Sequence, residues 1–190
     1  MDALSLFSSR RSASANKLGG PGPSPQQLRK ILTIASRVPD HRMLAPWRFI
    51  VFEGEARKAF GEALARALVA EEKEAPSDMR LNTERQRLLR APHVVALISS
   101  PKIDQKATPE WEQVLSCGAA GMNLCLAANA MGFGTAWITE WYSYSPAIRK
   151  TLGLAPQEKV AGFIYIGTVL EPQGDRDRPR LEDIVTEWKG

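Results

Sequence analysis

The chain has 190 residues, of which 25 are basic and 21 acidic, so its formal net charge is +4, and 44% of its residues are hydrophobic. This composition is typical of a soluble globular protein and excludes disordered, collagen-like and low-complexity chains. No segment approaches the ~20 consecutive apolar residues that a membrane span needs, and the N-terminus lacks the basic-then-apolar order of a signal peptide, so we expect a cytoplasmic protein without membrane contact.

A loop-forming segment over residues 19–25 (Gly-Gly-Pro-Gly-Pro-Ser-Pro) separates a short opening helix from a second helix. Ser24 is suited to cap the second helix and Pro25 to occupy its first position, because a serine hydroxyl accepts backbone hydrogen bonds and proline lacks only a donor that is unused there. Apolar residues follow at helical spacing until Pro39, which ends the helix.

The elements after Pro39 alternate between strands and helices. We expect strands over residues 48–52, 93–99, 135–139 and 160–169, and helices over 53–74, 78–90 and from Ser145-Pro146 to Gly153. This interleaving predicts an α+β fold in a single domain over residues 1–190. The segment 171–190 begins with a charged, proline-containing stretch and is predicted to form a C-terminal arm.

The longest predicted helix ends at Gly132-Phe133-Gly134. Its apolar stripe consists of Trp111, Val114, Leu115, Gly118, Ala119, Met122, Cys125 and Leu126. Because the helix is rich in small residues, it suits either the middle of the fold or a subunit interface. Cys117 and Cys125 lie about 12 Å apart on such a helix, beyond the ~7 Å between Cα atoms that a disulfide allows, so we expect both to stay reduced.

The motifs of several common enzyme classes are absent. The sequence has no phosphate loop, no Gly-x-Gly-x-x-Gly after a strand, no Gly-x-Ser-x-Gly elbow and no His-Glu-x-x-His. Its two histidines have no ligand-type spacing, so no metal site is expected. A protein without evident nucleophiles or metal ligands can leave the chemistry to a cofactor.

A few basic and polar residues remain as candidates for a binding site. Arg10-Arg11-Ser12 follows the opening helix, and two guanidiniums with a hydroxyl could hold a phosphate, although an ordinary surface pair is the alternative. Arg37 and the segment 39–42 crowd the end of the second helix, where a polar loop is the alternative. Trp137 lies on a strand of small residues and suits either a core position or a platform for a ligand.

Several short blocks follow one another along the chain in a characteristic order. They are Met1-Asp2-Ala3-Leu4, Arg10-Arg11-Ser12-Ala13-Ser14, Pro39-Asp40-His41 with Ala45-Pro46-Trp47-Arg48-Phe49, Trp111-Glu112-Gln113, Ala127-Ala128, Gly132-Phe133-Gly134 with Trp137, and residues 159–168. In order and spacing they resemble the nitroreductase family of FMN enzymes, and within it the small single-domain branch of NAD(P)H nitroreductases. The resemblance covers residues 1–170.

The resemblance implies an α+β fold with a central, mainly antiparallel sheet flanked by helices. It further implies an intertwined homodimer with two FMN sites at the subunit interface. Carried over by position, Arg10, Arg11 and Ser12 would hold the FMN phosphate and ribityl chain. In the wider family a basic residue near the C-terminus also touches the phosphate, and Arg180 is the candidate here, with Arg178 as the alternative.

Two further segments are carried over to the flavin ring. Arg37 and His41 would meet the flavin from the helix end and the loop that follows it, in the same subunit or in its partner. Trp137, Ile138 and Thr139 would line the isoalloxazine ring, with backbone groups reaching its heteroatoms. His41 departs from the small polar residues that many relatives carry, so specificity can differ.

The segment associated with NAD(P) in this branch consists of Ala127, Ala128, Asn129, Ala130, Met131 and Gly132. Physically, a helix segment so rich in small apolar residues is better suited to buried packing.

The function implied is a ping-pong oxidoreductase. NADPH or NADH would deliver hydride to N5 of bound FMN, and a nitroaromatic compound, a quinone or a similar small-molecule acceptor would then take it up. No side chain would be catalytic, because the flavin carries the chemistry.

Two alternatives stay open. One is a specialised flavin enzyme of the same fold, such as a dehalogenase, a dehydrogenase or a flavin-modifying enzyme. The other is a basic nucleic-acid-binding domain that uses Arg10-Arg11, the arginines over 85–90 and the tryptophans. Because Glu84 interrupts the basic run over 80–90, a solvated helix face is the simpler interpretation, and no nucleic-acid partner is expected.

Overall fold

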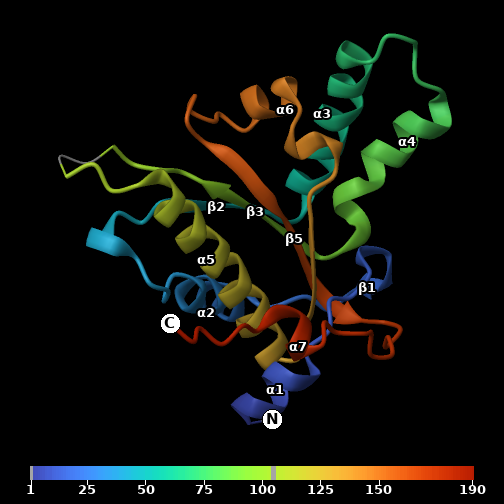
Figure 1. Ribbon diagram of the computed structural model, residues 1–190. Coiled ribbons are helices and arrows are strands. Elements are labelled where there is room, and N and C mark those ends of the chain that lie inside the picture. The colour runs from blue at the N-terminus through green and yellow to red at the C-terminus, as the bar shows by residue number, and fades with distance from the viewer. Residues whose placement is uncertain (1, 104–105) are drawn as a thin grey trace.

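An antiparallel sheet forms the centre of the computed structural model, which describes residues 2–103 and 106–190 (Figure 1). Its strands are β1 (Leu18–Gly19), β2 (Trp47–Phe52), β3 (His93–Ser99), β4 (Gly134–Ile138) and β5 (Lys159–Val169). The path through the sheet runs β1-β5-β3-β2, with β4 also paired to β5, and all of these pairs are antiparallel. The predicted α+β fold is confirmed. Met1, part of the first block, lies outside the described residues.

Helices cover both faces of this sheet. They are α1 (Ala3–Ser9), α2 (Pro25–Ala35), α3 (Glu55–Glu71), α4 (Asp78–Gln86), α5 (Glu110–Ala130), α6 (Pro146–Thr151) and α7 (Leu181–Ile184), with short 3-10 turns η1 (Ala15–Lys17), η2 (His41–Met43), η3 (Arg87–Arg90) and η4 (Trp141–Ser143). The helix predicted over 78–90 is thus α4 continued by the turn η3. The one predicted over 53–74 is α3, shorter at both ends.

The second helix begins where serine and proline predict it. The Ser24 hydroxyl accepts from the Gln27 N–H, the Gln27 side chain accepts from the Ser24 N–H, and Pro25 occupies the first turn. This reciprocal capping box satisfies two N–H groups of the helix terminus.

The core divides into two layers because alternate residues of a strand point to opposite faces of a sheet. Val94, Ala96 and Ile98 of β3 pack with α3 and α6 on one face. Val95 and Leu97 pack with α2 and α5 on the other face. Strand β5 follows the same alternation, so its middle is buried on both sides.

Helix α5 lies across one face of the sheet beside α2 (Figure 1). The residues buried on it are mostly small: Gln113, Ser116, Cys117, Ala120, Gly121, Leu124, Cys125, Ala127 and Ala128. Three residues of the stripe predicted from the sequence face outward instead, because Trp111, Leu115 and Met122 are 69%, 54% and 40% exposed. The small residues bring the helix close to the sheet and leave these large side chains largely exposed.

The end of α5 has the predicted glycine cap. Gly132 has a positive φ of 86°, and the N–H groups of Gly132 and Phe133 donate to the carbonyls of Asn129 and Ala128. These two bonds form a Schellman motif, which glycine favours because it lacks a Cβ. Strand β4 follows immediately, one residue earlier than predicted.

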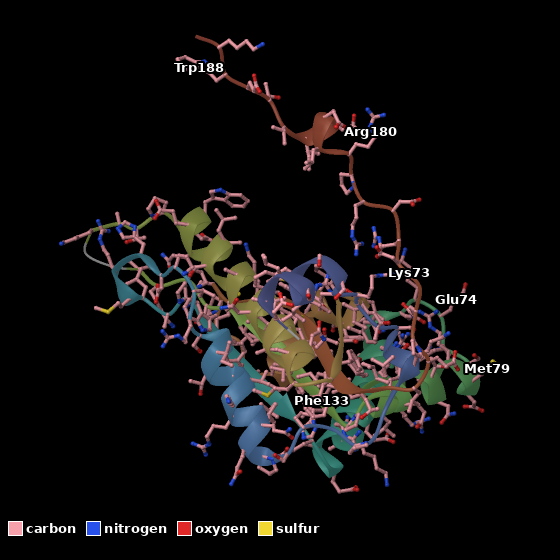
Figure 2. All side chains as sticks on the ribbon, turned by 90° about the horizontal axis from the view of Figure 1, so that it is seen from below. Lys73, Glu74, Met79, Phe133, Arg180 and Trp188 are labelled. Carbon is pink, nitrogen blue, oxygen red and sulfur yellow. The ribbon has the colours of Figure 1, made fainter. Side chains whose placement is uncertain are left out.

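The C-terminal segment 171–190 extends away from the rest of the molecule, as Figure 2 shows at Arg180 and Trp188. All of its residues are exposed, including the apolar Leu181, Ile184 and Val185. Within the described residues, no helix is long and apolar enough to cross a membrane.

Candidate functional site

The segment Arg10-Arg11-Ser12 forms a small basic cradle where α1 ends. Arg10 is the residue after the last turn of α1, and its Nη1 lies 3.4 Å from the Ser12 hydroxyl. The Arg11 side chain is 22% exposed, yet its Nη1 is buried and makes no hydrogen bond. The carboxylate nearest to it belongs to Asp175, at 3.7 Å. A buried guanidinium donor without an acceptor is costly in a folded protein, and a phosphate oxygen would satisfy it.

The cradle is fixed beside strand β4. The N–H of Ala13 donates to the carbonyl of Thr135 at 2.8 Å, which ties the residue after the cradle to β4. Arg10 also lies near the second half of α5, because its charge lowers the pKa of Cys125, although burial of the thiol has the larger effect and the pKa is raised overall. The tertiary structure therefore brings Arg10-Arg11-Ser12 next to the strand that ends at Ile138.

Trp137 is held by packing and by one hydrogen bond. Its Nε1 donates to the carbonyl of Ala161 at 3.1 Å, where the register between β3 and β5 shifts. A β-bulge of this kind turns a carbonyl out of the ladder. The indole ring lies where a Cβ would stand on Gly121 of α5 or on Gly162 of β5, at 2.4 and 2.2 Å from those positions. The two glycines thus make the space for Trp137, and the ring is only partly exposed.

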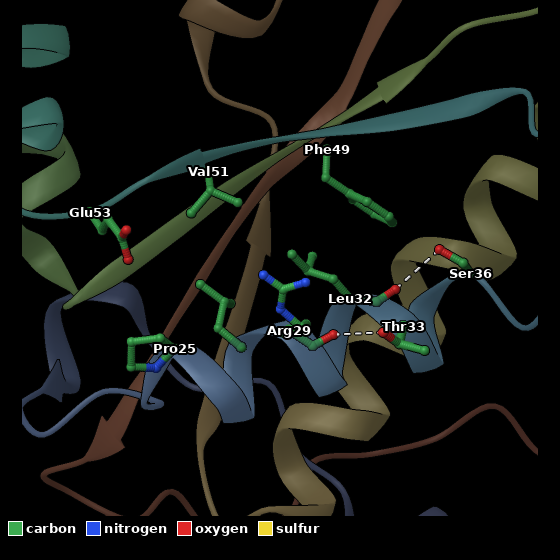
Figure 3. A pocket seen from close by; sticks show the side chains of 9 residues that line it. Pro25, Arg29, Leu32, Thr33, Ser36, Phe49, Val51 and Glu53 are labelled. Atoms are coloured by element: carbon green, nitrogen blue, oxygen red, sulfur yellow. Dashed lines mark hydrogen bonds between the residues drawn. The ribbon is translucent and has the colours of Figure 1, made fainter.

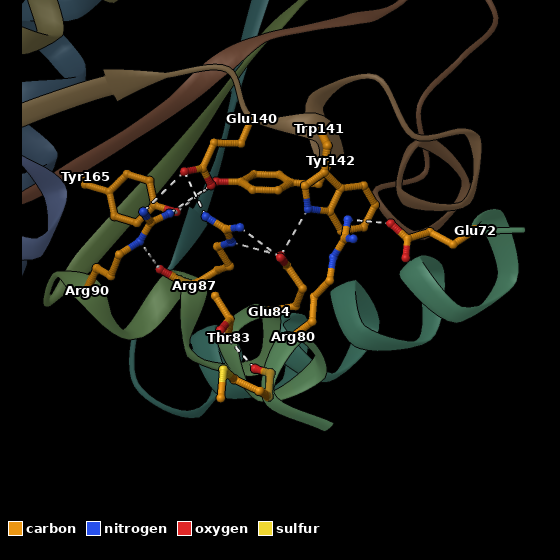
Figure 4. A network of polar contacts seen from close by, with 11 residues as sticks. Glu72, Arg80, Thr83, Glu84, Arg87, Arg90, Glu140, Trp141, Tyr142 and Tyr165 are labelled. Atoms are coloured by element: carbon orange, nitrogen blue, oxygen red, sulfur yellow. Dashed lines mark hydrogen bonds and ion pairs between the residues drawn. The ribbon is translucent and has the colours of Figure 1, made fainter. Parts of the chain in front are cut away.

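The segment after Trp137 is anchored by a polar network (Figure 4). Ile138 is half-buried and Thr139 is exposed, and the next residue, Glu140, accepts hydrogen bonds from Arg87 at 3.0 Å and from Arg90 at 2.9 and 3.2 Å. Because both oxygens of the carboxylate are bound, the end of β4 cannot move independently of η3.

The same network continues into the core. Arg87 makes two hydrogen bonds of 2.8 Å with the buried Glu84, which also accepts from the Trp141 indole at 3.1 Å. Arg90 contacts the Tyr165 hydroxyl at 3.1 Å, and its guanidinium lies over the tyrosine ring. Burial lowers the pKa of Arg90, but its bonds to Glu140 and Tyr165 outweigh this effect and raise it. Both arginines therefore stay charged and fully paired.

Arg37 and His41 contact α5 at different heights, Arg37 at Asn123 in its second half and His41 at Glu112 in its first turn. The Asn123 side chain donates to the Arg37 carbonyl at 2.9 Å, and the exposed Arg37 side chain points away from the core. His41 Nδ1 lies 2.7 Å from the Glu112 carboxylate, in the first turn of α5. Glu112 and Cys125 are about 20 Å apart along the helix axis, so in a single chain His41 is far from the cradle.

Among the other predicted site residues, Asn129 reaches β4, because its side-chain amide donates to the Phe133 carbonyl at 2.7 Å and lies 3.4 Å from the Thr135 hydroxyl. Arg180 lies in the arm, 74% exposed, with its Nε at 3.2 Å from Glu182. In the segment predicted for NAD(P), Ala127 and Ala128 are 4% and 0% exposed, which agrees with the packing role suggested by their size. The other residues of that segment are Asn129, Ala130, Met131 and Gly132, which are exposed or half-buried.

A groove of about 550 Å³ lies elsewhere, between α2 and the edge strand β2 (Figure 3). Its apolar floor comes from Leu28, Leu32, Phe49 and Val51. None of the residues predicted to bind a cofactor lines it. Figure 3 shows the Arg29 side chain beside Leu32, extending from α2 toward β2, so the groove combines apolar side chains with one basic group.

The arginines of the basic run over residues 80–90 are paired with carboxylates. Arg85 pairs with Glu62 at 3.1 Å, and Arg87 and Arg90 are bound to Glu84 and Glu140. This pairing agrees with the simpler interpretation of the run as a solvated helix face. Across the described residues there is also no cluster of three His, Cys, Asp or Glu side chains that could hold a metal ion.

Sequence reasoning missed the acidic partners of the site. In the sequence, Glu84 interrupts a basic run. Its spacing of three residues from Arg87 is also typical of an ion pair on a helix, and this is the signal that could have identified it. Glu140 and Glu112 gave no local signal, because their partners are 50 to 71 residues away along the chain.

Comparisons with known proteins agree with this fold. A family model described as "Nitroreductase family" matches residues 8–168. The Escherichia coli (strain K12) protein named "Putative NAD(P)H nitroreductase YdjA" is 38% identical over 168 residues, which cover 88% of each chain.

Two solved structures show the same fold. The nitroreductase-like family protein from Bacillus cereus has a TM-score of 0.83 at 19% identity, over 100% of this chain and 97% of that one. A variant of the FMN and NADPH-dependent nitroreductase NfnB, from a strain of sphigopyxis, has a TM-score of 0.75 at 20% identity, over 100% of both chains.

Proposed function

The chain belongs to the nitroreductase family of oxidoreductases, and from this premise we propose that it binds FMN and passes hydride from NADPH or NADH to a nitroaromatic compound, a quinone or a similar acceptor by a ping-pong mechanism. The names of its relatives support both cofactors, since YdjA is named for NAD(P)H and NfnB for FMN and NADPH. Bound FMN would supply the hydride chemistry, so the protein needs no nucleophilic side chain.

The observation that carries this proposal is the buried Nη1 of Arg11, which makes no hydrogen bond and has only the exposed Asp175 carboxylate near it, at 3.7 Å. Arg10 and Ser12 stand beside it, so the cradle offers several donors to a phosphate. The donor set therefore fits the phosphate end of FMN. The Arg11 guanidinium would contribute a charge-assisted bond, which is stronger than a bond between neutral groups.

The end of β4 is suited to orient the flavin ring. Thr135 is the β4 residue to which the segment after the cradle is bonded, and it is followed by Trp137, Ile138 and Thr139. The next residue, Glu140, fixes the end of this segment through its hydrogen bonds. Backbone donors fixed in this way would stabilise negative charge on a reduced flavin without reorganising, which is the usual source of electrostatic catalysis.

We further propose that two copies of the chain complete each site. In one chain, His41 is bound near the start of α5 and the cradle lies near its end, so a partner subunit would have to bring His41 to the flavin. Large apolar side chains are exposed on α1 and α5, among them Phe7 at 60% and Trp111 at 69%. Exposed apolar surface of this kind is typical of an interface.

The arm supports the intertwined form of this dimer. Leu181, Ile184 and Trp188 are 69%, 64% and 91% exposed, with no contact that would bury them in their own chain. The apolar groove between α2 and β2 is a candidate surface for the arm of the partner. An arm that crosses to the partner could also bring Arg180 to the phosphate.

The visible absorption spectrum of the purified protein, before and after anaerobic addition of NADPH, tests the function. We expect a flavin spectrum that bleaches. A flavin that stays oxidised with both NADPH and NADH would favour a specialised flavin enzyme of the same fold. A colourless protein that takes up no added FMN would overturn the cradle as a phosphate site.

A further inference from the structure

One long-range polar contact holds a predicted flavin residue, and the proposed function does not use it. His41 Nδ1 and a carboxylate oxygen of Glu112 lie 2.7 Å apart, although the two residues are 71 positions apart in sequence. Their side chains are 52% and 47% exposed. An exposed ion pair contributes little to stability, so folding alone gives no strong reason for this contact.

The loop that carries His41 is held in one conformation. The Asp40 carboxylate accepts from the N–H groups of Leu44 and Ala45 at 3.1 and 2.9 Å. Arg42, Met43 and Ala45 have positive φ angles of 62°, 54° and 45°, which side chains other than glycine rarely adopt. Such a loop persists only where its surroundings determine it.

Helix α5 supplies part of these surroundings. The Ser116 hydroxyl donates to the Pro39 carbonyl at the start of the loop, and Glu112 binds His41 two residues further on. Glu112 and Ser116 are four residues apart, so they lie on the same face of α5. The loop backbone and the imidazole are therefore positioned by neighbouring turns of one rigid helix.

The contact also decides which nitrogen of His41 is available. A carboxylate only accepts hydrogen bonds when it is ionised, so Nδ1 must carry a proton toward Glu112. Nε2 is then the nitrogen that is presented to a ligand, and the ring cannot flip without losing the bond.

We propose that Glu112 is a positioning residue of the flavin site: it fixes the ring orientation and the Nδ1 proton of His41 so that Nε2 faces the flavin. This inference rests on the proposed FMN binding. Glu112 itself touches no part of the flavin and acts only through His41.

A double-mutant cycle on FMN affinity tests the proposal. Apoproteins of the wild type and of the His41→Ala, Glu112→Ala and double variants are titrated with FMN, and quenching of flavin fluorescence gives Kd. A hydrogen bond of ordinary strength predicts that each single variant weakens binding about 2- to 10-fold. The double variant should bind no more weakly than His41→Ala, because Glu112 has nothing left to position.

Two further variants separate positioning from charge and from folding. Glu112→Gln keeps an oxygen acceptor for Nδ1–H and should recover most of the affinity lost in Glu112→Ala. Glu110→Gln removes a carboxylate from the same turn of α5, where it only faces Lys159 at 3.8 Å, and should leave Kd unchanged. The melting temperatures of all apoproteins should agree, because the pair is exposed.

Each other outcome overturns the proposal in a recognisable way. If Glu112→Ala weakens binding equally with and without His41, the residue acts on its own and not through the imidazole. If His41→Ala leaves Kd unchanged, His41 is not a flavin residue, while FMN binding stands. If the wild type binds no FMN, the proposed function itself fails.

Discussion

Two pairs of arginines that are close in sequence, Arg10 with Arg11 and Arg87 with Arg90, differ in how their guanidinium groups are hydrogen-bonded. In the polar network around Glu140 and Glu84, all guanidinium nitrogens of Arg87 and Arg90 donate to carboxylates, to a carbonyl or to a tyrosine hydroxyl. In the cradle after α1, Arg10 lies 3.4 Å from the Ser12 hydroxyl, and a buried nitrogen of Arg11 makes no hydrogen bond within the described residues, with the exposed Asp175 carboxylate at 3.7 Å.

This difference in hydrogen bonding predicts that Arg87 and Arg90 stabilise the fold, whereas Arg10 and Arg11 bind a ligand. A paired guanidinium has its desolvation compensated within the chain, so its loss should affect stability. A buried donor without a hydrogen bond, such as Nη1 of Arg11 with a carboxylate no closer than 3.7 Å, has its desolvation poorly compensated, so its loss should affect binding and spare the fold. The following changes test this contrast, starting with the largest expected effect.

Glu140→Ala should have the largest effect, and it should act on stability. It leaves Arg87 with the remaining partner Glu84 and Arg90 with Tyr165, so the free energy of unfolding should fall by about 3–4 kcal/mol. Urea unfolding of the apoprotein measures this loss. Glu110→Ala, which removes an exposed carboxylate, is the control and should cost less than about 0.5 kcal/mol. Equal losses in the two variants would contradict a structural role for the network.

Acid should weaken another arginine–carboxylate pair, that of Arg48 and Glu158. Arg48 holds the buried Glu158 through bonds of 2.7 and 2.8 Å, and this pairing lowers the pKa of Glu158 from 4.5 to about 2. Because the folded pKa is lowered, the stabilisation is complete above about pH 4.5 and is lost as the pH falls toward 2. It amounts to at most about 3 kcal/mol, since Arg48 is 38% exposed.

Glu158→Gln checks this expectation. Unfolding free energies of the wild type and the variant are measured between pH 5 and about pH 2. The variant should start less stable and lose less stability over that range. Parallel acid profiles would mean that Glu158 titrates normally in the folded protein.

Arg11→Ala should act on binding instead of stability. Loss of one charge-assisted bond to phosphate should raise the Kd for FMN about 10- to 100-fold, while the melting temperature of the apoprotein should not fall. FMN titration and thermal unfolding of the same samples measure both effects. If the variant binds FMN as the wild type does but unfolds more easily, Arg11 stabilises the fold and does not bind the phosphate.

The smallest effect is expected in the arm. Arg180 is exposed, and its guanidinium lies 3.2 Å from the Glu182 carboxylate. Arg180→Ala should weaken FMN binding about threefold without changing stability, because a long exposed side chain loses entropy on ordering. Arg178→Ala, measured in the same titration, should have no effect. The reverse result would assign the phosphate contact to Arg178.

Much of the fold was predictable because its signals are local. The β-branched segment 93–99 became strand β3 with the same bounds, Ser24 capped α2 as expected, and Gly132 ended α5. Each of these depends on the conformational preferences of one residue or a short run. Which face of α5 points outward was harder to predict from the sequence. Its buried side consists mostly of Ala, Gly, Ser and Cys, which give a weak hydrophobic pattern.

The site was predictable only as a list of residues from the family resemblance. That list contains Arg11 and His41 but not Glu140 or Glu112, which hold the segments on which the predicted residues lie. A carboxylate whose partner is 50 or more residues away looks like any exposed acidic residue in the sequence.

By itself, the sequence determined the succession of helices and strands, the family and the residue types that could meet a phosphate. Only the tertiary structure decided which arginines were already paired, that Ala13 ties the cradle to β4, and that His41 lies at the far end of α5 from it. The physical reason is that secondary structure follows from local conformational preference, whereas the pairing of a charge depends on which distant segment the chain folds against it.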